Sequence, residues 1–154
     1  MPVNRKYPLQ QLMAACEYYV SEKGKMITFE YILIAGLNDQ LEQVKPLAEL
    51  GAYFSLPGYF AHERKTRQRE AFRQVPSDRL LIETDAPDQL LPAERIRYPL
   101  TDPATGKAIN HPANLGAVYR FASELLDKPV ELLAERVEEN FRRLFGALSS
   151  HRTL

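Results

Sequence analysis

The chain has 154 residues, of which 45% are hydrophobic, and its 20 basic and 20 acidic side chains cancel to a formal net charge of zero at pH 7. This length suffices for one hydrophobic core, and the neutrality gives no overall argument for nucleic-acid binding. One cysteine excludes a disulfide framework and no apolar run is long enough to span a bilayer, so we expect a cytoplasmic protein without membrane contact.

Helix and strand patterns alternate along the chain, which predicts an α/β fold with parallel strands. In the first half we expect a helix at 9–22 closed by Gly24, a strand at 27–34, a helix from an N-cap at Asn38 to residue 50 with a kink or restart at Pro46, and a strand at 52–56. In the second half we expect a helix at 65–75, a strand at 79–84, and helices at 113–126 and 130–148. The proline-rich segment at 86–112 is expected to be irregular, to lie outside the core, and to be either functional or disordered.

A basic stretch, HERKTRQREAFRQ at residues 62–74, follows the predicted strand at 52–56. Clustered cations at such a place are suited to contacting phosphate backbones. The alternative is a solvated amphipathic helix that turns Ala71 and Phe72 inward, and the pattern favours this second interpretation.

The segment LLIETDAP at residues 80–87 places Glu83 and Asp85 at the end of an apolar strand. In α/β sheets and (βα)8 barrels, reactive groups lie where parallel strands end, and the chain-turning pair Ala86-Pro87 fits that position. The alternative is that Asp85 caps the next turn or is solvated, and spacing alone does not decide between them. Strand alternation puts Glu83 on the same face as Asp85, where it would either orient the site or bond a neighbouring basic or backbone group.

Four segments occur in the order GAYFSLPGYF (51–60), LLIETDAP (80–87), NHPANL (110–115) and VEENFRRLFG (137–146). Together they resemble the C-terminal part of the TatD family of metal-dependent hydrolases, over about residues 49–148. The resemblance implies a (βα)8 barrel that holds two divalent metals, Mg, Mn or Zn, and hydrolyses phosphodiesters, with DNA as the expected substrate. It also implies that Asp85 is the catalytic residue and a metal ligand that handles a proton of the attacking water.

The other ligands of that family are missing from this sequence. The family needs a His-x-His pair on its first strand, a bridging Glu and two later histidines, whereas this chain has only His62, His111 and His151, none at the end of a strand pattern. A hydrolytic metal site usually needs three or more protein ligands. We expect His111 to cap the following helix rather than to bind metal, and we expect a second copy or a partner to complete the barrel and the site.

The first third of the chain is similar to a different family. The strings MPVNRKYP (1–8) and ITFEYILIAGLND (27–39) resemble a late segment of the radical S-adenosylmethionine enzymes that methylate an adenine of 23S ribosomal RNA. In that family the three cysteines that bind the iron–sulfur cluster lie upstream of this segment, and they are absent here. Cys16 is the only thiol, lies among apolar residues of the first predicted helix, and is expected to be buried rather than to act as a ligand.

The two resemblances predict a methyltransferase-like segment at 1–48 and a hydrolase-like portion at 49–154, packed as one compact unit. About three parallel strands with flanking helices would form a partial (βα)8-type barrel fragment, and the junction near residues 48–51 suggests a fusion of two barrel enzymes. Three functions stay open: an incomplete metal-dependent phosphodiesterase, a remnant of the RNA methyltransferase, and a non-catalytic α/β domain.

Overall fold

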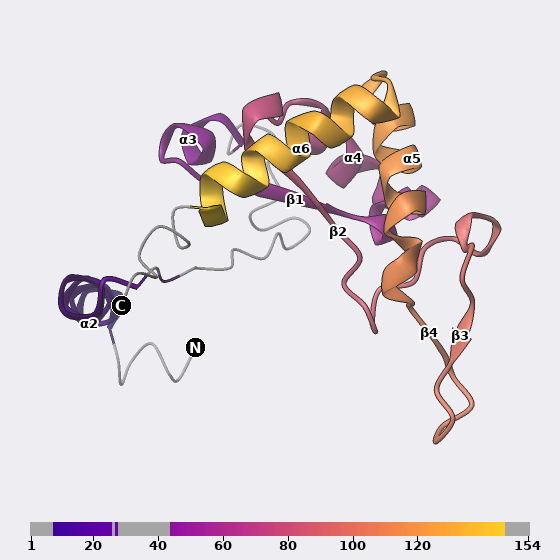
Figure 1. The fold of residues 1–154 in the computed structure, drawn as a ribbon, viewed down its shortest axis with the longest axis horizontal. Helices are drawn as coiled ribbons and strands as arrows, with labels where there is room; N and C mark the ends of the chain where they lie inside the picture. Colours follow the sequence, from indigo (N-terminus) through magenta and orange to yellow (C-terminus); the bar gives the residue numbers. More distant parts are fainter. Residues whose placement is uncertain (1–7, 26, 28–43, 147–154) are drawn as a thin grey trace. The chain divides into compact units, whose positions relative to one another are not determined.

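The computed structural model describes residues 8–25, 27 and 44–146 (Figure 1). The chain divides into two units, one formed by residues 1–32 and 145–154 and the other by residues 33–144. In the first unit the structure describes helix α2 (Leu9–Lys23), and in the second it describes two small sheets with their helices. The strand predicted at 27–34, apart from residue 27, and the N-cap predicted at Asn38 lie outside the described residues. None of the described helices has the length and apolar character that crossing a membrane requires.

Helix α2 matches the helix predicted at 9–22 and ends as predicted. Gly24 adopts a left-handed conformation with φ of 59°, and its N–H donates to the carbonyl oxygen of Val20 at 2.9 Å. The predicted burial is wrong, because Cys16 is only half-buried. The apolar residues of the same helix that remain between 39% and 49% exposed are Leu12, Met13, Tyr19 and Val20. Local propensity and the glycine cap therefore account for this helix better than burial does.

The second unit follows the predicted alternation of helices and strands. In chain order its elements are α3 (Val44–Glu49), β1 (Phe54–Pro57), α4 (Thr66–Arg73), β2 (Leu80–Glu83), β3 (Leu100–Thr101), β4 (Ala108–Ile109), α5 (Leu115–Leu126) and α6 (Val130–Phe145). Short 3-10 segments lie at Gly58–Ala61, Glu63–Lys65, Ser77–Arg79, Ala93–Arg95 and Pro112–Asn114. Pro46 lies in the first turn of α3, where its missing N–H removes no helical hydrogen bond.

Strands β1 and β2 pair in parallel, in a register that aligns Phe54 with Leu80 and Pro57 with Glu83. Strands β3 and β4 form a separate antiparallel hairpin. The parallel α/β arrangement is therefore confirmed for two strands. The third strand of the expected barrel fragment falls almost entirely on residues outside the described part, so the barrel itself stays a prediction.

The core of this unit lies between the parallel sheet and helices α4, α5 and α6. Its buried residues come from all of these elements and are Leu56, Phe72, Leu80, Phe121, Ala122, Leu125, Leu133 and Val137. Ala71 and Phe72 of α4 are both buried, which confirms the amphipathic-helix interpretation for the helical part of the basic stretch, Thr66–Arg73. The helices thus cover the sheet and leave the ends of its strands to the connecting loops.

The proline-rich segment at 86–112 is part of the core, so the prediction that it lies outside is wrong. Leu91 is only 2% exposed and packs in a second buried cluster with Ala117 and Val118 of α5. Arg95 of the same segment makes two hydrogen bonds to the carboxylate of Glu124, at 2.7 and 3.2 Å, and these bonds lower the pKa of Glu124. The adjacent pair Leu90-Leu91 beside Pro92 shows neither helical nor strand periodicity, which is why the sequence pattern did not reveal the burial of Leu91.

Gly58, directly after β1, is a position where a side chain has no room. A Cβ atom there would lie 2.8 Å from Cγ of Leu91 and 2.9 Å from Cγ2 of Val118. We expect Gly58→Ala to lower the free energy of unfolding by about 2 kcal/mol through overpacking, as measured by urea denaturation. Gly116→Ala is the matched control, since its Cβ would meet only a terminal nitrogen of Arg120 at 3.9 Å. That helical substitution should stabilise by roughly 0.5–1 kcal/mol, and equal effects at both glycines would contradict the packing argument.

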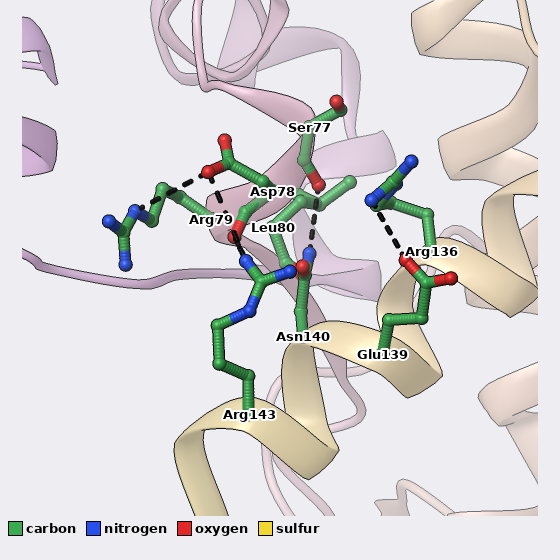
Figure 2. A network of polar contacts seen from close by, with 8 residues as sticks. All are labelled: Ser77, Asp78, Arg79, Leu80, Arg136, Glu139, Asn140 and Arg143. Atoms are coloured by element: carbon green, nitrogen blue, oxygen red, sulfur yellow. Dashed lines mark hydrogen bonds and ion pairs between the residues drawn. The ribbon is translucent and has the colours of Figure 1, made fainter.

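Helix α6 is tied to the start of β2 by a buried asparagine (Figure 2). The side-chain amide of Asn140 donates to the carbonyl oxygens of Ser77 and Leu80, each at 2.8 Å, and the residue is 0% exposed. Its Oδ1 has no hydrogen-bond partner in the described part of the chain. Around it, Arg143 lies 4.0 Å from the carboxylate of Asp78 at the surface. The start of β2 is therefore held by a hydrogen-bond donor, the Asn140 side chain, on α6, the last described helix.

Candidate functional site

The parallel strands bring two loops to the same edge of the sheet. β1 ends at Pro57 and β2 ends at Glu83, and these two residues are paired in the register. Asp85 lies two residues beyond the end of β2, at the carboxyl edge where the sequence analysis placed it. The structure therefore places this residue as predicted, while its chemical role stays a prediction.

The backbone at Asp85 is left-handed, with φ of 57°, and Gln89 in the same loop has φ of 50°. Few non-glycine residues adopt this region, although aspartate tolerates it better than most. Asp88 N–H donates to the carbonyl oxygen of Asp85 at 2.8 Å and closes a tight turn. Because β2 ends at Glu83 and the chain then leaves the extended conformation, strand alternation does not determine how Glu83 and Asp85 face one another. The surrounding structure must hold this loop in its conformation.

Asn110 provides much of that support. It is 1% exposed, and its side-chain amide donates to the carbonyl oxygen of Thr84 at 2.6 Å and to that of Gln89 at 3.4 Å. Its backbone N–H donates to Pro87 O at 2.8 Å. One buried residue thus satisfies carbonyl groups at both ends and in the middle of the loop that carries Asp85.

Asn114 extends this polar network away from the sheet edge. It is 0% exposed, and its Oδ1 accepts the backbone N–H groups of Arg97 at 3.0 Å and Tyr98 at 2.9 Å. Its amide donates to Tyr98 O at 3.0 Å and to Oδ1 of Asn110 at 3.4 Å. The NHPANL motif carries a family resemblance but no spacing that predicts these contacts, so both asparagines were missed as positioning residues.

The histidines have structural contacts. Nδ1 of His111 accepts the backbone N–H of Ala113 at 2.9 Å, so the prediction that His111 caps the start of the following helical segment is confirmed. Nε2 of His62 lies 2.9 Å from Leu90 O, and because a carbonyl only accepts, this nitrogen carries the proton. That bond links the loop after β1 to the loop after β2. His151 lies outside the described residues.

The described residues do not fit a complete metal centre. Residues 8–25, 27 and 44–146 contain no group of three or more His, Cys, Asp or Glu side chains that could hold a metal ion. A catalytic metal of the kind expected for hydrolysis takes about three protein ligands. Within this part of the chain, the arrangement supplies a positioned carboxylate, Asp85, but not the set of ligands around it.

Comparison with known proteins links most of the chain to one family. The family model for TatD related DNase matches residues 17–146, which begins earlier than the start expected near residue 49. The crystal structure of YjjV, a TatD homologue from Escherichia coli K12, superposes with a TM-score of 0.58 at 25% sequence identity. The superposition covers 73% of this chain and 39% of that protein.

A second similarity covers a short segment. The chain is 56% identical over 50 residues to the probable dual-specificity RNA methyltransferase RlmN of Pelotomaculum thermopropionicum and 54% identical over 50 residues to that of Geobacillus thermodenitrificans. These matches cover 32% of this chain and 14% of each methyltransferase, which supports the predicted methyltransferase-like segment. Because the TatD match extends over far more than half of the sequence, the chain belongs to the family of TatD related DNases.

Proposed function

We propose that this chain contributes Asp85 to the active site of a phosphodiester hydrolase that acts on DNA. The observation that carries the proposal is the position of Asp85 at the carboxyl edge of the parallel sheet, in a loop that Asn110 holds from inside the protein. There the Asp85 carboxylate would bind a divalent cation and accept a proton from the attacking water. Family membership supports the reaction class.

The site needs more ligands than the described residues contain. We propose that a second copy of the chain, or a partner chain, supplies them and completes the barrel. Oxygen donors such as the Asp85 carboxylate suit Mg or Mn, and zinc also accepts a carboxylate ligand. The chain spans 39% of the length of YjjV.

The test is cleavage of short DNA by the purified chain with magnesium, manganese or zinc. We expect Asp85→Asn, which keeps the side-chain shape, to lower the rate by at least about 100-fold, as is typical for a lost acid–base group. If a second copy completes the site, the specific activity should rise with chain concentration. Cleavage that survives the substitution, or a folded wild-type chain that cleaves nothing with any of the three metals, would contradict the proposal.

The methyltransferase-like segment supports a second candidate, a remnant of an RNA methyltransferase that binds S-adenosylmethionine. The supporting observation is the 56% identity over 50 residues. One thiol, Cys16, does not suffice for a four-iron cluster, so radical chemistry would need another chain. Calorimetric binding of S-adenosylmethionine that is lost when the first third is removed would favour this candidate. A folded chain that binds neither metal nor S-adenosylmethionine would instead be a non-catalytic α/β domain.

A further inference from the structure

The loop after β1 holds two cations against one aromatic ring. The guanidinium carbon of Arg64 lies 5.3 Å from the centroid of the Tyr59 ring, and Nζ of Lys65 lies 4.9 Å from it. Arg64 also donates a hydrogen bond to the Tyr59 hydroxyl, and Lys65 lies 5.8 Å from the Phe60 ring. Cation–π contacts of this kind fix the position of a charge.

Among the described residues, no carboxylate pairs with either of these two charges. In the described part of the chain no ion pair involves Arg64 or Lys65, whereas Arg95, Arg136 and Arg142 each pair with a glutamate. An aromatic face attracts a cation without cancelling its charge. Arg64 and Lys65 therefore keep unused N–H donors and a local positive potential in a chain that is neutral overall.

The loop that presents them is held by its own hydrogen bonds. The Arg69 guanidinium donates to the carbonyl oxygens of Phe60 and Glu63, at 3.1 and 3.2 Å, and to Oγ1 of Thr66 at 3.0 Å. His62 adds the bond to Leu90 in the loop after β2. A binding loop that is already ordered loses less conformational entropy when a ligand binds.

The position of the loop indicates the ligand. Tyr59 lies two residues after Pro57, Asp85 lies two residues after Glu83, and Pro57 and Glu83 are register partners, so both loops leave the same edge of the sheet. We propose that Tyr59, Arg64 and Lys65 form a phosphate-binding site for single-stranded polynucleotide, next to Asp85. The inference rests on the proposed function for its orientation, since the strand would pass from this site to Asp85. A cluster confined to one loop suits one flexible strand, because duplex binding usually takes a broader basic face.

The test measures binding of a fluorescently labelled 12-nucleotide single-stranded DNA to the full chain by anisotropy, in EDTA so that no cleavage occurs. We expect the double variant Arg64→Gln, Lys65→Gln to bind about tenfold more weakly at low salt. The slope of log affinity against log salt should fall by about 1.4, because single strands contribute roughly 0.7 per phosphate contact. Tyr59→Leu keeps both charges but removes the aromatic ring that positions them, so its affinity for the DNA should fall by less than that of the double variant.

The matched control removes two cations elsewhere, Arg136→Gln with Arg142→Gln on α6, where Glu139 and Glu138 already neutralise them. This control should keep its affinity within about twofold. Equal affinities of the test and control variants would overturn the proposal, as would displacement of the DNA by inorganic phosphate at the same total phosphate concentration. Binding that depends on the loop while cleavage is absent would support this site and contradict only the hydrolase proposal.

Discussion

Replacing Asn140 by Asp is expected to lower the free energy of unfolding by about 4 kcal/mol at pH 7. The amide of Asn140 donates to two carbonyl oxygens in a position with no exposure to solvent. A carboxylate has no donor, so it would leave both carbonyls unsatisfied and would bring a negative charge next to them. Urea denaturation followed by circular dichroism measures the change.

The same variant should show a characteristic pH dependence. Burial beside two carbonyl oxygens raises the folded-state pKa of the new carboxyl above its value in the unfolded chain. The folded state then binds the proton more tightly than the unfolded chain does. The loss of unfolding free energy relative to the wild type should therefore be fully present above the folded-state pKa and should shrink as the pH falls through that pKa. Glu139→Gln exchanges a carboxylate for an amide at an exposed neighbouring position, and it should change the free energy of unfolding by less than about 0.5 kcal/mol. A deficit for Asn140→Asp as small as the control's would contradict the buried-donor argument.

Asn110→Ala is expected to lower the free energy of unfolding by about 3 kcal/mol and to loosen the loop that carries Asp85. Truncation removes the donors to Thr84 and Gln89 and also the oxygen that accepts from Asn114. Unsatisfied buried carbonyls cost about 1–3 kcal/mol each, and the small cavity adds to this. Hydrogen exchange should become faster across residues 84–90, where the Asp88 N–H closes the turn.

Asn114→Ala is the matched control for that loop. Asn114 is equally buried and belongs to the same network, but its strongest bonds go to the backbone of Arg97 and Tyr98. Asn114→Ala should accelerate hydrogen exchange at residues 97–98, and the exchange rates at residues 84–90 should stay closer to those of the wild type. If both substitutions loosened the same residues equally, Asn110 would not be the specific support of the Asp85 loop.

Local patterns predicted those parts of the fold that local interactions specify. Apolar runs identified β1 and β2 to within two residues at each end, and Gly24 ended α2 as expected. The cap by His111 was predicted because it acts over two residues. The end of a strand also sufficed to place Asp85 at the sheet edge.

The supports of the site could not be predicted in this way. Asn110 and Asn140 satisfy carbonyl groups 26 and 60 or more residues away, and no spacing in the sequence records such a pairing. Asparagine is typical of turns and caps, so its pattern favours exposure. The backbone at Asp85 is left-handed, so strand alternation does not extend to this residue, and the relative facing of Glu83 and Asp85 stays a prediction.

The distant anchoring of β2 also affects the order of events during synthesis. Asn140 reaches Ser77 across 63 residues, and Asn110 reaches Thr84 across 26, so both ends of this strand are secured by later parts of the chain. At roughly 5–20 residues per second, Asn140 leaves the ribosome about 3 to 12 s after Ser77. Strand β2, which precedes the Asp85 loop, must therefore wait for α6 while α4 and α5 have already emerged, and this non-local pairing slows folding.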